Sequence, residues 1–183
     1  MRITATKDRN RAFSSDLIIV PVFEDFIPEI TLSALGSNEI PKMASRAGFK
    51  GKLKQTAFVE ANGHTFLLTG LGKKAGFKLE SLRRSYAESF SKLKGTGSET
   101  VAILLPGIMD GEAFEAVYIL RVSHYYFDAF QEEKTTFPDL VIQVVTEKEH
   151  VLFLTLLDKS RKELRYGSCH YTSIPLFHIS LLP

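Results

Sequence analysis

The chain has 183 residues, a length typical of a single globular domain or of one domain with a short extension. Hydrophobic residues make up 44% and charged residues 24%, with 12 glycines and 7 prolines, which excludes collagen-like, low-complexity and intrinsically disordered proteins. The net charge of +2 is too small to draw the whole molecule onto nucleic acid or an acidic membrane, so such binding would need a local patch.

The cellular compartment is indicated by the cysteine count and the apolar runs. The single cysteine, Cys169, cannot form an internal disulfide and indicates a reducing compartment. No apolar run reaches the roughly 18 to 20 residues that a membrane-spanning helix needs, and the polar start differs from a secretory signal. We therefore expect a cytoplasmic protein with no membrane partner.

The N-terminal third of the chain predicts strands of a central sheet. Residues 3–6 form a short edge strand, and the continuous apolar run over 16–23 is typical of a strand covered on both faces. A short helix is expected over 28–35. Gly36 to Asn38 interrupt it, and Pro41 is expected to block its continuation.

An antiparallel hairpin is the next predicted element. Two runs of β-forming residues, 54–60 and 64–69, flank the pair Asn62-Gly63. An Asn-Gly pair between such runs is the strongest short hairpin signal that a sequence contains.

The second half of the chain alternates helices with buried strands. Apolar residues recur at three- and four-residue spacing from Leu79 to Leu93, which predicts an amphipathic helix. Strands are then predicted over 100–105 and 140–145, alternating with helices over 111–130 and 147–164. The core-facing positions of the last two helices are expected to be Ala113, Val117, Leu120, His124 and Phe127, and then Val151, Leu154 and Leu157. This alternation predicts an α/β fold with right-handed crossovers, a mixed, mainly parallel sheet, and helices on both faces.

A glycine-rich turn between the hairpin and the first long helix is the main candidate binding site. Residues 70–75 fit the glycine pattern of a dinucleotide-binding turn, which makes Gly70, Gly72 and Lys73 candidates for nucleotide contact. However, the following strand ends without an Asp or Glu to hold a ribose hydroxyl, and the P-loop spacing is absent. A tight strand-to-helix turn with solvated lysines is the favoured interpretation.

No catalytic or metal-binding constellation is predicted. The five histidines lack zinc-site spacing; they are His64, His124, His150, His170 and His178. His124 is expected to be a hydrogen-bonded core or interface residue, and Cys169 is expected to be inert beside His170. Asp16, Glu24 and Asp25 flank the first long strand and are expected to be solvated.

One local basic patch stands out. Five positive charges fall within thirteen residues, at Lys42, Arg46, Lys50, Lys52 and Lys54. The patch lacks repeated aromatic residues for base stacking and any groove-reading motif. A solvated basic loop is therefore favoured over nucleic-acid binding, for which Lys50, Lys52 and Lys54 are the weak candidates.

Several segments, taken in order, resemble the N-terminal domain of the leucyl (cytosol) aminopeptidase family. They are Asp16 to Glu24, Phe49-Lys50-Gly51-Lys52, Leu67 to Lys73, and the helices 79–93 and 112–128. The Gly-Leu-Gly-Lys turn and the Tyr126-Phe127-Asp128 helix end are the most telling pieces. The resemblance covers residues 1–150 and leaves 151–183 as a helix and tail, where a missing catalytic domain would begin.

The resemblance implies a three-layer α/β/α sandwich related to macro domains, and it implies that this domain is not the catalytic part. The family removes N-terminal residues with two divalent metal ions bound in a longer C-terminal domain. This sequence lacks the family's Asn-Thr-Asp-Ala-Glu-Gly-Arg segment, so no catalytic residue, metal ligand or cofactor is assigned to it. Residues 161–175 are similar to the entry into that domain. The apolar end, 174–183, either packs on the core or is the remnant of a longer protein.

Three functions are therefore considered. The preferred one is a non-catalytic aminopeptidase domain that acts by assembly, with a homo-oligomer or a catalytic domain as partner; the family enzyme is a hexamer. The alternative is a macro-like module that binds ADP-ribose or another nucleotide at the carboxyl ends of the strands. Against it, the macro-domain Asn-Ala-Ala-Asn and Gly-Gly-Gly loops are absent. The weakest is nucleic-acid binding through the basic patch.

Overall fold

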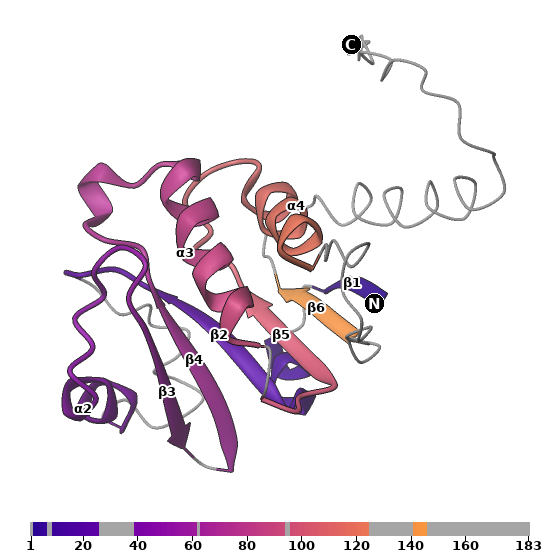
Figure 1. The fold of residues 1–183 in the computed structure, drawn as a ribbon, viewed down its shortest axis with the longest axis horizontal. Coiled ribbons are helices and arrows are strands. Elements are labelled where there is room, and N and C mark those ends of the chain that lie inside the picture. Colours follow the sequence, from indigo (N-terminus) through magenta and orange to yellow (C-terminus); the bar gives the residue numbers. More distant parts are fainter. Residues whose placement is uncertain are drawn as a thin grey trace, which may run out of the picture.

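A computed structural model of the chain describes residues 2–6, 9–25, 39–61, 63–93, 96–124 and 141–145 (Figure 1). Six described strands form one sheet in the order β1-β6-β5-β2-β4-β3. Their bounds are β1 Arg2–Thr6, β2 Leu17–Val22, β3 Thr56–Ala61, β4 His64–Gly70, β5 Thr100–Leu104 and β6 Val141–Val145. All neighbouring strands are parallel except β3 and β4. The predicted α/β class with a mixed, mainly parallel sheet is confirmed.

Strand β2 lies inside the sheet, and all six of its residues are buried. Leu17 and Ile19 pack into one apolar cluster, while Ile18 packs into a second cluster on the opposite face. A strand covered on both faces needs apolar residues at every position, which explains the continuous run in the sequence. Pro21 has no N–H to donate, and it lies beyond the three residues through which β2 pairs with β5.

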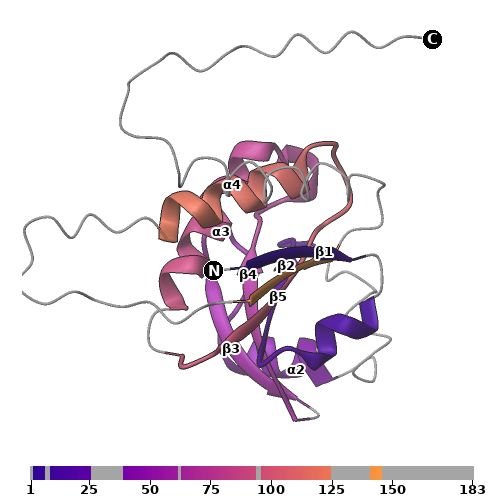
Figure 2. The same cartoon turned by 90° about the vertical axis from the view of Figure 1, so that its right-hand side faces the viewer.

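Helices lie on both sides of the sheet (Figure 2). Helices α3 (Leu79–Lys92) and α4 (Glu112–His124) cover one face and share its apolar cluster. The 3-10 helix η1 (Arg9–Ser14) and the short helix α2 (Glu39–Arg46) contribute to the cluster on the other face. A second 3-10 turn, η2 (Lys74–Gly76), precedes α3. Within the described ranges, none of the helices combines the length and apolar composition needed to cross a bilayer.

The predicted elements are largely confirmed where the chain is described. The hairpin is antiparallel, with Ala61 opposite His64, and α3 begins at the predicted Leu79. In α4 the predicted core positions Ala113, Val117 and Leu120 are buried. The helices predicted over 28–35 and 147–164, the side chains of His124 and Phe127, and the domain boundary at residue 150 lie outside the described residues.

Helix α2 was not predicted, and whether Pro41 limits a helix over 28–35 lies outside the described residues. Pro41 lies in the first turn of α2. At that place a backbone N–H has no partner within the helix, so a residue without an N–H is tolerated.

Candidate functional site

The glycine turn lies at the carboxyl edge of the sheet, where open α/β sheets bind their ligands. It follows β4 directly, and Gly72 has a φ of +76° that a side chain would disfavour. Helix α3 does not start at the turn, because η2 intervenes and α3 begins only at Leu79. The turn therefore does not present its glycines at the N-terminus of a helix, as a dinucleotide-binding turn does.

The first three backbone N–H groups of this turn are bound within the protein. Three hydrogen bonds use them: Gly70 N–H to the carbonyl of Gln55 (2.7 Å), Leu71 N–H to that of Val22 (2.8 Å), and Gly72 N–H to that of Gly51 (2.9 Å). A phosphate cradle needs N–H groups that point at the ligand. At these three positions a phosphate would have to displace the carbonyl groups of the protein itself.

The loop 49–55 is packed against the glycine turn at backbone distance. A Cβ atom on Gly70 would collide with the carbonyl oxygen of Lys52 and would lie 2.7 Å from the carbonyl carbon of Gly51. Gly51 has a φ of +70°, and its own Cβ would lie 2.6 Å from the carbonyl oxygen of Phe23. The glycines thus allow three backbone segments to approach closely, which is an architectural role. The nucleotide candidates Gly70, Gly72 and Lys73 stay a prediction, which the geometry disfavours.

Two buried serines dock α3 onto the same turn. The Ser85 hydroxyl donates a hydrogen bond to the carbonyl of Gly70 (2.6 Å) and accepts one from the Lys54 N–H (3.3 Å). One turn further along α3, the Ser89 hydroxyl lies 2.5 Å from the hydroxyl of Thr69. The sequence analysis missed these residues. The sequence pattern that could have identified them is the four-residue spacing of two small polar residues beside the apolar stripe of α3.

The loop that follows β5 is also closed internally, by the carboxylate of Glu112 at the start of α4. This carboxylate accepts three backbone hydrogen bonds: from Gly107 N–H (2.7 Å), Ile108 N–H (2.9 Å) and Met109 N–H (2.7 Å). Glu112 is only 3% exposed. The sequence analysis also missed this residue, although an acidic residue in the first turn of a helix after Pro-Gly was a usable signal.

Most titratable side chains near α3 are held in structural contacts. Arg83 binds the buried carboxylate of Glu115 through two nitrogens, at 2.5 Å and 2.6 Å, and thereby joins α3 to α4. These hydrogen bonds raise the pKa of Arg83 above its usual value. Tyr86 donates its hydroxyl to the carbonyl of Leu104 (2.6 Å), and burial raises its pKa well above the ordinary value. Neither group is available as an acid or base near neutral pH.

The three carboxylates around β2 do not form a pair. Asp16 precedes β2, whereas Glu24 and Asp25 follow it at the opposite edge of the sheet. Asp16 accepts hydrogen bonds from the Thr100 hydroxyl (2.7 Å) and from the Thr100 N–H (2.8 Å), and these lower its pKa. A general acid needs a raised pKa, so Asp16 does not have the properties of one.

Metal binding finds no support in the described part of the chain. There, no group of three or more His, Cys, Asp or Glu side chains lies close enough together to hold an ion. The resemblance implied two divalent metals in a C-terminal domain, and their location stays a prediction. His64 packs edge to face on the ring of Phe13 at 5.5 Å and lines a cavity of about 350 Å³ with residues of the hairpin end. Cys169 and His150, His170 and His178 lie outside the described residues.

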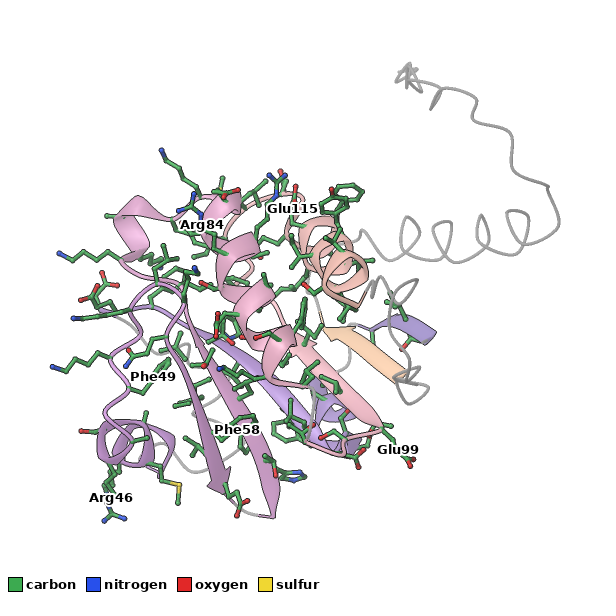
Figure 3. All side chains as sticks on the ribbon, viewed as in Figure 1. Arg46, Phe49, Phe58, Arg84, Glu99 and Glu115 are labelled. Carbon is green, nitrogen blue, oxygen red and sulfur yellow. The ribbon has the colours of Figure 1, made fainter. Side chains whose placement is uncertain are left out.

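The basic patch is divided between α2 and the loop 49–55. Its side chains at Lys42, Arg46, Lys50, Lys52 and Lys54 are all exposed. Phe49, the aromatic residue among them, is buried under the loop, whereas Arg46 points outward (Figure 3). A stacking platform for bases needs an accessible ring, which Phe49 does not provide.

We expect no specific DNA binding by this patch. Replacing Lys50, Lys52 and Lys54 by Ala should leave the weak affinity for DNA at physiological salt unchanged. Contacts between scattered surface lysines and phosphates are sensitive to salt, so they contribute little to the affinity at that salt concentration. Fluorescence anisotropy with a labelled duplex at two salt concentrations measures this. Tight binding that survives physiological salt and is lost in the triple variant would contradict the expectation.

The fold and these turns define an α/β domain whose described carboxyl-edge loops are held by hydrogen bonds within the protein. The model of the cytosol aminopeptidase family, N-terminal domain, matches residues 19–134. The chain therefore belongs to the cytosol aminopeptidase family and contains its N-terminal domain, as the resemblance implied.

Individual relatives agree with this assignment. A probable cytosol aminopeptidase of Gloeobacter violaceus is 29% identical over 119 residues, which cover 61% of this chain and 24% of the relative. A probable cytosol aminopeptidase of Alkaliphilus oremlandii is 28% identical over 127 residues, which cover 64% of this chain and 25% of the relative. The chain thus spans about a quarter of the length of the curated relatives that it matches.

Solved structures show the same fold at low identity. A mutant of tomato leucine aminopeptidase superposes with a TM-score of 0.71 at 14% identity, covering 87% of this chain and 35% of that one. The bottromycin maturation enzyme BotP superposes with a TM-score of 0.55 at 15% identity, covering 77% of this chain and 29% of that one.

Proposed function

We propose that the chain is a non-catalytic N-terminal domain of an aminopeptidase, which acts by assembly and by shaping access to an active site carried by another part of the enzyme. The observation that carries this proposal is that the loops after β4 and β5, at the ligand-binding edge, are held by hydrogen bonds within the protein. The N–H groups of Leu71 and Gly72 after β4 are bound to backbone carbonyls, and those of Gly107, Ile108 and Met109 after β5 are bound to Glu112. Such an edge suits a rigid scaffold better than a receptor for small molecules.

The partner that follows from this proposal is the catalytic domain of the aminopeptidase, with a homo-oligomer as the larger assembly. In support, the chain corresponds to only a quarter of its curated relatives, whose names describe the whole enzyme. The two metal ions would then be bound in that catalytic domain. We also propose a cytoplasmic location, in line with the description of the family.

We expect the purified chain to show no aminopeptidase activity. Two-metal hydrolysis needs several convergent carboxylates around the ions, and the described residues contain no such cluster. The measurement is turnover of leucine p-nitroanilide with added manganese or zinc. Activity that persists through rigorous purification would overturn the proposal.

A second experiment, co-purification, tests the assembly role. The chain, tagged and expressed in its native cells, should co-purify with a metal-dependent leucine p-nitroanilide activity that the recombinant chain lacks. A matched tagged chain with Gly70→Val, which we expect to be misfolded, serves as the control for non-specific capture. Equal activity recovered with both chains, or with neither, would contradict the assembly role.

A further inference from the structure

The loop 49–55 and the glycine turn together carry an exposed surface at the carboxyl edge of the sheet. Leu53, an apolar residue, is 40% exposed there. Its Cβ lies 3.5 Å from the position that a Cβ on Gly72 would occupy, so the loop lies directly against the turn. The same two segments contain four exposed lysines. We call the five residues the Leu53 surface: Lys50, Lys52, Leu53, Lys54 and Lys73.

The backbone beneath these lysines is fixed by hydrogen bonds. The Oε1 atom of Gln55 accepts hydrogen bonds from Lys50 N–H (2.8 Å) and Lys52 N–H (3.4 Å). Its Nε2 atom donates one to the carbonyl of Gly48 (2.9 Å). Because this backbone is already ordered, a partner that contacts the lysines has to order only their side chains, which favours binding.

Lys54 occupies a backbone position that suits glycine better. Its φ is +66°, and no other non-glycine residue in the described part of the chain has a positive φ. Lys54 N–H binds the carbonyl of Gly70 (3.1 Å), while Gly70 N–H binds the carbonyl of Gln55 (2.7 Å). Two residues thus oppose one, as in the β-bulge whose first position is usually a glycine. Strain of this kind is concentrated at functional positions, so it indicates a role for the lysine side chain.

The lysines leave a net positive charge at this edge. Within the described residues, ion pairs link charged side chains of α3 and α4, but none of the four lysines forms one. Two exposed carboxylates are nearby, because Glu24 N–H binds the carbonyl of Gly72 (2.9 Å) and Asp25 follows it in the chain. Four lysines outnumber these two carboxylates, so the surface attracts an acidic partner.

The composition of the surface favours a protein as that partner. An apolar centre with a polar, accessible rim is typical of protein–protein interfaces. Nucleic acid is disfavoured, because Phe49 is buried and cannot stack on bases. A second copy is disfavoured, because it would bring two positively charged surfaces together. The complementary partner is a protein surface on which aspartates and glutamates surround an apolar side chain.

We propose that the Leu53 surface docks onto an acidic surface of the catalytic part of the aminopeptidase. Leu53 makes the apolar contact, and the four lysines face carboxylates of the partner. The identity of the partner rests on the proposed function, whereas the docking face rests on the residues described above. Charge pairs at the rim of an interface steer the encounter and weaken as salt is added, so the docking should be sensitive to salt.

The test is co-purification of a metal-dependent leucine p-nitroanilide activity with the tagged chain from its native cells, after nuclease treatment. The double variant Lys52→Glu/Lys73→Glu should recover at least about ten-fold less activity than the wild type, because like charges then face each other. The matched control is Lys92→Glu, which reverses a half-exposed lysine on α3, outside the Leu53 surface. It should recover as much activity as the wild type.

A Lys54→Gly variant separates docking from folding. Glycine accepts the positive φ at this position, so the purified variant should melt at the wild-type temperature or above it. The recovered activity should nevertheless fall several-fold, because the lysine side chain is lost. Unchanged activity would show that the side chain has no part in docking.

Four outcomes would overturn the docking site. Equal activity with the wild type, the double variant and Lys54→Gly shows that the catalytic part binds elsewhere, and it leaves the proposed function standing. No activity with the wild type removes the proposed function and this site with it. Activity that nuclease treatment removes assigns the surface to nucleic acid. A purified wild-type dimer that the double variant makes monomeric assigns it to a second copy. If circular dichroism shows the double variant unfolded, Lys54→Gly decides alone.

Discussion

Replacing Gly70 by Ala is expected to destabilise the fold by about 4 kcal/mol or more, at the upper end of what single substitutions cost. The added Cβ would occupy the space of the Lys52 carbonyl oxygen. That carbonyl belongs to backbone rather than to a movable side-chain end, and it accepts a hydrogen bond from Gln55 N–H at 2.9 Å. Relief of the clash would have to move the loop 49–55 away from the turn and break the hydrogen bonds between them.

Two other glycines provide a matched series. Gly72 has a φ of +76° but space for a Cβ, which would lie 3.5 Å from the Cβ of Leu53, so Gly72→Ala should cost about 1 to 3 kcal/mol. Gly72→Val should cost more, because a β-branched residue is more restricted in this backbone region. At Gly76 nothing lies within 4 Å of an added Cβ, so Gly76→Ala should be nearly neutral.

Urea unfolding of the variants measures their free energies of unfolding and so tests the expected order of destabilisation, Gly70→Ala above Gly72→Ala above Gly76→Ala. A cost for Gly70→Ala that is no larger than that for Gly76→Ala would show that the loop 49–55 is not packed as described. Calorimetric titration of the wild type and of Gly72→Val with ADP-ribose, NAD and ATP then separates architecture from binding. Micromolar binding to the wild type that a folded Gly72→Val lacks would restore the nucleotide-binding alternative.

Local sequence patterns predicted the elements of this fold because each pattern reflects a local environment. The run from Leu17 to Val22 is apolar throughout because both faces of β2 are covered. The pair at 62–63 marks a hairpin because a two-residue turn needs residues that accept a positive φ, and Gly63 has a φ of +77°. Helix α2 escaped prediction because a proline inside a short segment is read as a break unless the helix start is known.

The contacts that make up the candidate site could not be predicted, because they join residues that are distant in the chain. Nothing in the local pattern around Gly51 shows that it lies against Phe23 and accepts a hydrogen bond from Gly72. The family resemblance nevertheless rested in part on these segments. The segments around Gly51, Gly70 and Glu24, quoted separately from the sequence, are hydrogen-bonded to one another in the fold. Three segments of that ordered set of motifs therefore meet at one backbone junction.

Replacing Glu112 by Ala is expected to lower the free energy of unfolding by about 2 to 3 kcal/mol, since hydrogen bonds to a charged group are worth more than neutral ones. The substitution leaves the N–H groups of Gly107, Ile108 and Met109 without their acceptor. These three successive N–H groups form a concave site for an anion, which the Glu112 carboxylate fills in the wild type. The loop 105–111 and the start of α4 should loosen first.

The same geometry predicts that an added anion can restore part of the stability that Glu112→Ala loses. The change from Glu to Ala removes a CH2 group and a carboxylate, which acetate resembles in size and charge. Acetate should therefore raise the melting temperature of Glu112→Ala more than that of the wild type, in which the site is filled, because a ligand stabilises the state that binds it. The comparison uses sodium acetate against sodium chloride at equal ionic strength and pH.

Glu88→Ala is the matched control for charge removal, because the Glu88 carboxylate lies 3.5 Å from the Lys92 ammonium on the surface of α3 and such pairs contribute little. It should lose less than about 0.5 kcal/mol and respond to acetate as the wild type does. Equal acetate effects in all three proteins would show that the N–H groups after β5 do not form an anion site. A Glu112→Ala chain as stable as Glu88→Ala would show that the carboxylate does not hold the loop.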